Sequence, residues 1–133
     1  IEDLTAYENV EAVLWPSVDY TKEKQEAKTL EVLREVDMLE RRDHFPRQMS
    51  GGEQQRIAIE RALVNSPPIL FCDEPTGNLD SVTGQHVMQM HEKLNSNGIT
   101  IVMVTHDPRS ATHAKRVICI KDGKLCTEKD LMC

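Results

Sequence analysis

Apolar residues in the first half of the chain recur every three or four positions, with Lys and Glu residues between them. This spacing is typical of helices that bury one face and leave the other in water. It predicts a helix that begins after Thr5 and ends at Trp15-Pro16, because threonine caps helices and proline stops them. A longer helix is expected to begin after Thr21, with Leu33 and Val36 on its apolar face.

A third helix is expected directly after a pair of glycines. Ser50 stands three residues before Glu53, which is the spacing of a capping box. The apolar residues that follow keep a helical period as far as Asn65, so this helix is expected to begin at Gly51.

The pattern changes after residue 66, where short apolar runs alternate with polar stretches. Strands are expected at residues 69–72, 99–105 and 116–120, and helices at 81–97 and after Pro108. Strands that alternate with helices are typical of an α/β fold with a mostly parallel sheet. The chain therefore divides into a helical part, residues 1–65, and an α/β part, residues 66–133.

The composition excludes several classes of protein. With 133 residues, 39% apolar residues and 29% charged residues, the chain is expected to form one soluble globular domain. A net charge of −6 and a pI of about 5.3 argue against a nucleic-acid surface, which needs clustered Lys and Arg. No apolar run approaches the roughly 20 residues that span a bilayer, and the opening Ile1-Glu2-Asp3 does not resemble a signal peptide. The cysteines lack the spacing of a zinc site and are too few for a secreted disulfide scaffold.

The apolar run at residues 69–72 leads directly into two carboxylates, Asp73 and Glu74. Such a strand is expected to be buried in a parallel sheet, and its carboxyl end is where nucleotide phosphates and Mg²⁺ bind in these folds. Asp73 is suited to hold Mg²⁺ through water, and Glu74 to orient or deprotonate an attacking water. The alternative is an acidic turn without a catalytic role, because Asp-Glu before Pro75 is a common turn sequence.

The sequence Ser50-Gly51-Gly52 offers a phosphate contact at the start of the third helix. A serine hydroxyl and free backbone N–H groups point outward there, and glycine lets the backbone approach an anion without a Cβ in the way. The alternative is an ordinary capped helix after a loop.

His106 follows the strand expected at residues 99–105, so it lies on the same side of the sheet as Glu74 if the two strands are parallel. It is then placed to donate a hydrogen bond to a terminal phosphate, although a single histidine is more often structural. Asp80 is either a functional residue or only the cap of the following helix. The remaining histidines show no ligand spacing and are interpreted as surface or linker residues: His44, His86, His91 and His113.

Together these motifs resemble those of the nucleotide-binding subunit of an ABC transporter. Residues 49–56 resemble the signature motif, 69–74 the Walker B strand with its catalytic glutamate, 77–80 the D-loop, and His106 the switch histidine. The resemblance covers essentially the whole chain. The segments 4–10, 74–80 and 105–108 most resemble the subgroup that serves lipoprotein release and macrolide-type export.

One family motif is missing from the sequence. A P-loop needs Gly, four residues and then Gly-Lys-Ser or Gly-Lys-Thr, but the only Gly-Lys, at Gly123-Lys124, is followed by Leu125. The family's adenine-stacking aromatic residue and Q-loop glutamine are also expected upstream of Leu4. We therefore expect an amino-terminally truncated α/β chain: a partial P-loop NTPase (ABC ATPase) core with a helical subdomain, and with the P-loop half missing.

A smaller departure is Glu60, which stands where the family usually has alanine. It follows Arg56 by four residues, and this spacing allows an ion pair on the surface of a helix. Glu60 is therefore expected to be exposed.

The resemblance implies an ATPase that drives transport or the extrusion of a lipoprotein or other substrate, at the cytoplasmic face of the cell membrane. ATP and Mg²⁺ are the implied cofactors. The implied partners are a second ATP-binding subunit in a head-to-tail dimer and transmembrane permease subunits, without nucleic acid. The implied site residues are Ser50, Gly51, Gly52 and Glu53 acting on the partner's ATP, Asp73 for Mg²⁺, Glu74 and His106 for catalysis, and Asp80 for coupling the two sites.

The resemblance also assigns the two parts of the chain. Residues 1–65 would form the helical subdomain that ends in the signature helix, and residues 1–48 of it would dock on the membrane subunits. Residues 66–133 would form the carboxyl-terminal part of the α/β ATPase core. The isolated chain is expected to be inactive.

Two alternatives belong to other classes of protein. The ATPase head of a DNA-repair or chromosome-organising protein shares the signature, Walker B and D-loop pattern, but a long coiled coil would precede the signature, and no sustained heptads precede Ser50. The acidic balance also disfavours DNA. The other alternative is a catalytically inert interaction fragment that folds poorly alone because its sheet exposes an edge.

Overall fold

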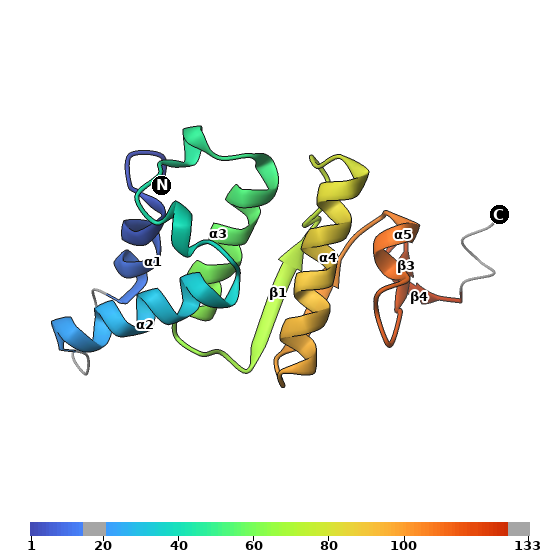
Figure 1. The fold of residues 1–133 in the computed structure, drawn as a ribbon. Coiled ribbons are helices and arrows are strands. Elements are labelled where there is room, and N and C mark those ends of the chain that lie inside the picture. Colours follow the sequence, from blue (N-terminus) through green and yellow to red (C-terminus); the bar gives the residue numbers. More distant parts are fainter. Residues whose placement is uncertain (15–20, 128–133) are drawn as a thin grey trace.

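The computed structural model describes residues 1–14 and 21–127. The helix end expected at Trp15-Pro16 therefore lies outside the described residues, as does Cys133. The elements are α1 (Ala6–Leu14), α2 (Lys22–Glu35), α3 (Gly51–Leu63), β1 (Ile69–Asp73), α4 (Ser81–Ser96), β2 (Thr100–Val104), α5 (Pro108–Ala111), β3 (Cys119–Lys121) and β4 (Lys124–Cys126), with 3₁₀ turns at Leu39–Arg41 and Pro46–Gln48. Figure 1 shows α1, α2 and α3 on one side, β1 and α4 in the middle, and the β3–β4 hairpin on the other side.

The helices of the first half begin where the sequence predicts. The Thr21 hydroxyl accepts a hydrogen bond from the Lys24 N–H at 3.3 Å, and the Ser50 hydroxyl accepts one from the Glu53 N–H at 3.2 Å. Each bond satisfies an N–H group that the first turn of a helix leaves without a partner. Among the described residues, no helix is both long enough and apolar enough to pass through a bilayer.

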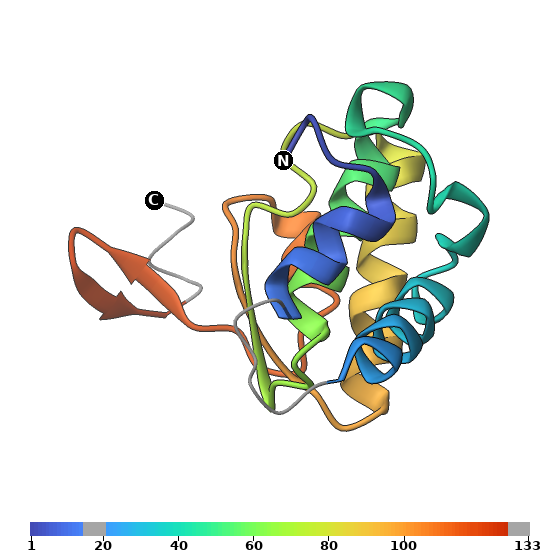
Figure 2. The same ribbon diagram turned by 90° about the vertical axis from the view of Figure 1, so that its left-hand side faces the viewer.

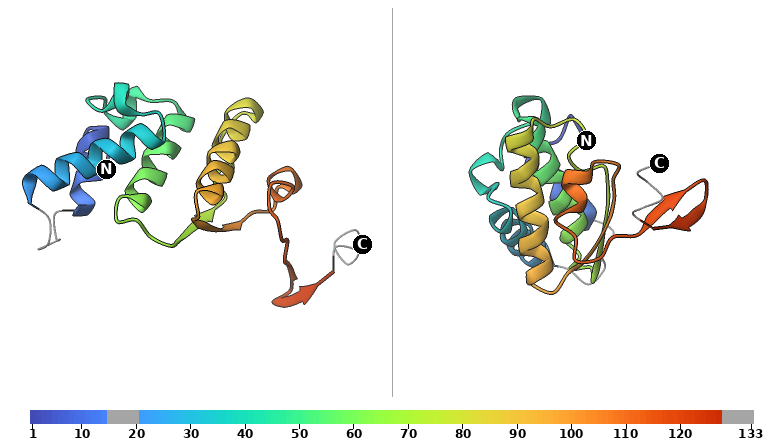
Figure 3. Two further views of the ribbon diagram at one scale, coloured as in Figure 1. Left: turned by 60° about the horizontal axis from the view of Figure 1, so that its bottom comes forward. Right: turned by 90° about the vertical axis from the view of Figure 1, so that its right-hand side faces the viewer.

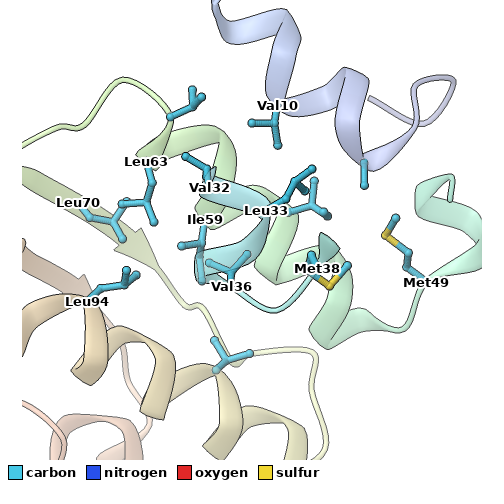
Figure 4. Close-up of a cluster of buried hydrophobic side chains, with 14 of the residues drawn as sticks. Val10, Val32, Leu33, Val36, Met38, Met49, Ile59, Leu63, Leu70 and Leu94 are labelled. Atoms are coloured by element: carbon cyan, nitrogen blue, oxygen red, sulfur yellow. The ribbon is translucent and has the colours of Figure 1, made fainter. Parts of the chain in front are cut away.

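The hydrophobic core lies where α1, α2 and α3 meet, and it continues onto the inner face of β1. Val10, Leu33 and Ile59 are buried in it. Figure 4 shows Leu63, Leu70 and Leu94 at the junction between the helical part and the strand-bearing part. Because one continuous core spans α3, β1 and α4, the helical part and the α/β part support each other.

The sheet consists of β1 and β2, which pair in parallel as predicted. The register runs from Ile69 opposite Thr100 to Asp73 opposite Val104. Helix α4 makes the crossover between the two strands. The carboxyl ends of both strands therefore meet at one edge of the sheet.

The prediction that residues 69–72 form a fully buried strand is wrong for one of its two faces. Leu70 is buried, whereas Phe71 is 76% exposed and Val104 of the neighbouring strand is 61% exposed. Side chains alternate between the two faces of a strand, and in the described part of the chain helices cover only one of them. A continuous apolar run is typical of a strand that other elements pack against on both faces of the sheet. The run does not identify the element that packs on the second face.

The end of the described chain forms a hairpin that the sequence predicts only in part. A strand was expected at residues 116–120, but β3 is shorter, and it pairs antiparallel with β4, which was not expected. The turn at Asp122-Gly123 was predicted and is confirmed, with φ of 52° and 74°. Asparagine, aspartate and glycine favour such turns because these residues tolerate positive φ. The hairpin forms its own sheet and lies away from the body of the molecule (Figures 2 and 3).

The expectation that Glu60 is exposed and paired with Arg56 is wrong. Its side chain is 0% exposed, and neither carboxylate oxygen has a hydrogen-bond partner. Burial raises the pKa of Glu60 to about 9, although the nearby Arg56 charge acts in the opposite direction. The Glu60 carboxyl is therefore protonated and neutral in the folded protein at neutral pH.

We expect the buried Glu60 carboxyl to make the folded state less stable as the pH rises. Its pKa is about 9 in the folded chain against an ordinary value of 4.5. Between these values the folded state holds a proton that the unfolded state has lost, so the free energy of unfolding falls by up to about 1.4 kcal/mol per pH unit. Urea unfolding of the wild type at pH 5, 6.5 and 8 should show this decline, and Glu60→Gln should remove it.

The matched control is Glu31→Gln, because the Glu31 side chain in α2 is 59% exposed. This variant should keep the pH dependence of the wild type. An equal pH dependence in wild type and Glu60→Gln would show that the Glu60 carboxyl does not titrate as described.

Candidate functional site

Glu74 and His106 lie in contact at the carboxyl edge of the sheet. Glu74 directly follows β1, and His106 follows β2 by two residues. His106 Nδ1 lies 2.7 Å from Glu74 Oε1, and the backbone N–H of His106 donates to the same oxygen at 2.9 Å. The imidazole ring is 91% exposed, whereas the Glu74 side chain is largely shielded. The parallel register thus brings together two residues that are 32 positions apart in the sequence.

The backbone of Glu74 is held in an unfavourable conformation. Its φ of 45° lies in the left-handed region, which residues other than glycine rarely adopt. The Glu74 N–H donates to the Val104 carbonyl oxygen at 2.9 Å, which ties the start of the loop to β2. Conformations of this kind persist when the surrounding structure enforces them, and they are frequent at functional sites.

Thr105 also holds the Glu74 carboxylate, and the sequence interpretation did not identify it. Its hydroxyl donates to Glu74 Oε2 at 3.3 Å and accepts a hydrogen bond from the Asp107 N–H at 3.0 Å. Both oxygens of Glu74 therefore receive hydrogen bonds from residues that follow β2. The sequence did contain one sign of this role, because a residue with a hydroxyl group stands directly before His106 at the end of the expected strand.

Asp73 ends β1 on the exposed face of the sheet. It alternates with the inward-facing Cys72 and so lies on the same face as Phe71. Its carboxylate suits Mg²⁺, which often takes only one or two protein carboxylates and completes its shell with water and phosphate oxygens. The described residues contain no cluster of three or more acidic, histidine or cysteine side chains that would hold a metal ion by themselves.

The first turn of α3 carries the Ser50–Glu53 group. The Ser50 hydroxyl caps the helix, while the Glu53 carboxylate lies 3.7 Å from Arg41 Nε. Gly51 and Gly52 lie against the start of α4. A Cβ on Gly51 would lie 2.9 Å from Leu79 Cδ2, and a Cβ on Gly52 would overlap the Thr83 methyl group. The two glycines thus permit a close approach between α3 and the turn before α4.

Asp80 caps α4, as the sequence predicts for one of its two interpretations. Its Oδ2 accepts a hydrogen bond from the Thr83 N–H at 3.1 Å. Hydrogen bonds from the Thr83 side chain and backbone lower the pKa of the Asp80 carboxyl. The residues expected at the site therefore form two groups, Glu74 with His106 and the capped turns at Ser50 and Asp80. Within residues 1–14 and 21–127, no recorded hydrogen bond or ion pair connects the two groups.

The interpretation of His91 as a surface or linker residue is wrong. His91 is 3% exposed, its Nδ1 lies 2.8 Å from the Val87 carbonyl oxygen, and its Nε2 lies 3.2 Å from Cys72 Sγ. A carbonyl only accepts, so Nδ1 carries the proton and Nε2 accepts from the thiol. Burial raises the pKa of Cys72 to about 11 and lowers that of His91, so both groups are neutral. This bond joins β1 to α4 one residue before Asp73.

The family model described as "ABC transporter" matches residues 1–77 of the chain. The chain belongs to the ABC transporter family. An uncharacterized ABC transporter ATP-binding protein of Methanocaldococcus jannaschii, MJ1508, is 47% identical over 126 residues, which cover 94% of this chain and 55% of that protein. The macrolide export ATP-binding/permease protein MacB of Chlorobium luteolum is 51% identical over 106 residues, which cover 78% of this chain and 16% of MacB.

Solved structures agree with this assignment. The ATP-binding cassette MJ0796 of the same archaeon, solved as a dimer bound to ADP and Pi, superimposes with a TM-score of 0.76 at 43% identity, over 94% of this chain and 56% of that one. The chain thus has the fold of part of an ABC ATPase cassette. It spans about half the length of these archaeal relatives.

We expect Cys72 to resist alkylation in the folded protein. A thiol with a pKa of about 11 is roughly 0.1% thiolate at pH 8, whereas a thiol with the usual value near 8.5 is roughly one quarter thiolate. Iodoacetamide at pH 8 should therefore modify Cys72 at least about 100-fold more slowly in the native chain than in the urea-unfolded chain, as followed by peptide mass spectrometry. Similar rates for Cys72 in the two states would contradict the neutral Cys72–His91 pair.

Proposed function

We propose that the chain is part of the ATP-binding subunit of an ABC transporter, and that Glu74 is the general base for ATP hydrolysis. The observation that carries this proposal is the contact between Glu74 Oε1 and His106 Nδ1, 2.7 Å long, at the carboxyl edge of a parallel sheet. In α/β folds this edge is where nucleotide phosphates bind. The family membership of the chain and the ADP and Pi bound to the related cassette MJ0796 support the same function.

The hydrogen bonds around Glu74 suit a base that has to be held in place. Thr105 and His106 donate to its two oxygens and fix the orientation of the carboxylate. An ionised carboxylate so oriented accepts a proton from a water molecule aligned with the terminal phosphate. The proposal therefore assigns catalysis to Glu74, with Thr105 as a positioning residue.

His106 is proposed to contact the terminal phosphate. Its Nδ1 faces Glu74, so Nε2 is the ring nitrogen left for a ligand, and the ring is 91% exposed. An imidazole that donates from both nitrogens carries a positive charge. That charge would lie between the carboxylate and the phosphate and would stabilise both.

Asp73 is proposed to help hold Mg²⁺. When bound, the ion would offset the negative charge that develops on the phosphate oxygens of ATP. Asp73 stands next to Glu74 at the end of β1 and is exposed. Its carboxylate would bind the ion through water, because Mg²⁺ commonly keeps much of its hydration shell in proteins.

The turns at Ser50 and Asp80 are proposed to act across a dimer. Ser50, Gly51, Gly52 and Glu53 would contact the ATP of a second subunit, with Asp80 coupling the two sites. The dimeric state of MJ0796 supports this arrangement. The N–H groups of Gly51 and Gly52 belong to the first turn of α3, where anions are attracted to a helix.

The two parts of the chain are proposed to have separate tasks. Residues 1–65 would form the helical subdomain, of which residues 1–48 would dock on transmembrane permease subunits at the cytoplasmic face of the membrane. Residues 66–133 would belong to the ATPase core. The relatives named ATP-binding/permease protein, in which both functions occur in one polypeptide, support a permease partner. Extrusion of a macrolide-like or lipoprotein substrate is the proposed transport activity.

We expect Glu74→Gln to abolish hydrolysis without abolishing nucleotide binding. A suitable protein is a chimera in which this chain replaces the matching part of MJ0796, which is 47% identical over 132 residues. Glutamine keeps the shape of the side chain but accepts no proton, so the rate constant of hydrolysis should fall by roughly 10²- to 10⁴-fold. Phosphate release measures hydrolysis, and a fluorescent ATP analogue measures binding.

Glu31→Gln, an exposed change in α2, serves as the control and should leave hydrolysis unchanged. The proposal is wrong if Glu74→Gln hydrolyses ATP as fast as the unaltered chimera. It is also wrong if that chimera is inactive under conditions in which MJ0796 itself hydrolyses ATP.

A further inference from the structure

The first turns of α3 and α4 are packed against each other through a glycine. Gly52, the second residue of α3, is buried, and a Cβ built on it would overlap Cγ2 of Thr83 in the first turn of α4. In Figures 2 and 3 these two turns lie together at the same end of the molecule. The Thr83 methyl group thus fills the space that any other side chain at position 52 would need.

The backbone of Thr83 is held in place by the cap of α4. Its backbone N–H donates to the Asp80 carboxylate that caps α4, at 3.1 Å. Threonine is branched at Cβ and has few rotamers open to it in a helix. The methyl group therefore has little freedom to move away from Gly52.

Ser50 and Thr83 also line one cavity. A cavity of about 200 Å³ between the two turns is lined by Ser50, Gly52, Glu53, Arg56, Thr83, His86 and Val87. Ser50 caps α3 and Asp80 caps α4. Because Ser50 and Gly52 belong to one turn and Asp80 and Thr83 to the other, the Gly52–Thr83 contact joins the two capped turns.

We propose that Thr83 is a positioning residue, which sets the placement of the Ser50 turn relative to the Asp80 turn by packing its methyl group against Gly52. Glycine is required at position 52 because of this contact within the chain. The inference rests on the proposed function, in which both turns face the nucleotide of a second subunit. Position 52 then requires glycine for two reasons. Glycine lets the backbone approach a bound phosphate, and it leaves room for the Thr83 methyl group within the chain.

The test is a double-mutant cycle between positions 52 and 83 in the chimera with MJ0796. Thr83→Ser removes only the methyl group and keeps the hydroxyl. Without that methyl, the nearest atom to a Cβ at position 52 is Cβ of residue 83, at an ordinary 3.8 Å. Gly52→Ala alone should therefore clash, and Gly52→Ala/Thr83→Ser should fit.

Two quantities are measured for each variant: the unfolding equilibrium constant in urea and kcat/KM for ATP. Gly52→Ala should raise the unfolding constant and lower kcat/KM by at least about 10-fold each, as expected of an overpacked contact. In the double variant both should return to within about 3-fold of Thr83→Ser alone. Alanine favours helices over glycine, so a loss of stability in Gly52→Ala reports the clash and not helix propensity.

Gly51 provides the matched control. A Cβ on Gly51 would meet Leu79 at 2.9 Å and has no contact with Thr83. Thr83→Ser should therefore rescue Gly52→Ala but not Gly51→Ala. Rescue of both, or of neither, would overturn the proposal.

The stability measurement separates this inference from the proposed function, because it needs no hydrolysis. If Gly52→Ala is as stable as the parent, the packing claim is wrong. If Thr83→Ser restores stability but not kcat/KM, the loss of kcat/KM comes from the nucleotide contact and not from the packing, and Thr83 has no positioning role. If the rescue holds while Glu74→Gln remains fully active, the catalytic assignment fails and the packing assignment stands.

Discussion

The parallel register between β1 and β2 is the constraint on which the rest of the structure depends. Asp73 lies opposite Val104, and the Glu74 N–H donates to the Val104 carbonyl oxygen, so β1 and β2 end at the same level of the sheet. The carboxylate of Glu74 then reaches the residues that follow β2, and Thr105 and His106 hold it. A one-residue slip would turn Asp73 and the apolar side chains to the opposite faces of the sheet. The register therefore fixes both the core and the chemistry of this edge.

The two faces of the sheet differ in how far their side chains are buried. On its inner face the sheet is tied to α4, through Leu70 in the core and through the neutral Cys72–His91 bond. On its outer face Phe71 and Val104 remain exposed. The helical part contains a group that lowers the stability of the fold. The Glu60 carboxyl is buried without a hydrogen-bond partner and keeps a proton to stay neutral. Stability thus comes from the core that α1, α2 and α3 share with β1 and α4, and the candidate site lies at its margin.

The sequence predicted the features that depend on neighbouring residues. The caps at Thr21, Ser50 and Asp80, the parallel strands and the turn at Asp122-Gly123 follow from local preferences and are present. The juxtaposition of Glu74 and His106 also follows, because parallel strands end at one edge. Features that depend on distant packing were missed: Thr105 on Glu74, His91 on Cys72, and the burial of Glu60. An apolar run predicts a strand but not which of its faces other elements pack against. A charged residue on a helix, such as Glu60, does not show how far the buried face of that helix extends.

The central claim is that the two strand ends place Glu74 and His106 in contact. The most direct measurement is solution NMR of the isotope-labelled chain, with nuclear Overhauser effects recorded between the His106 amide proton and the Glu74 side-chain protons. The account predicts these effects, together with cross-strand effects in the parallel register that places Asp73 beside Val104. Cross-strand effects of an antiparallel or shifted pairing, with none between Glu74 and His106, would contradict it.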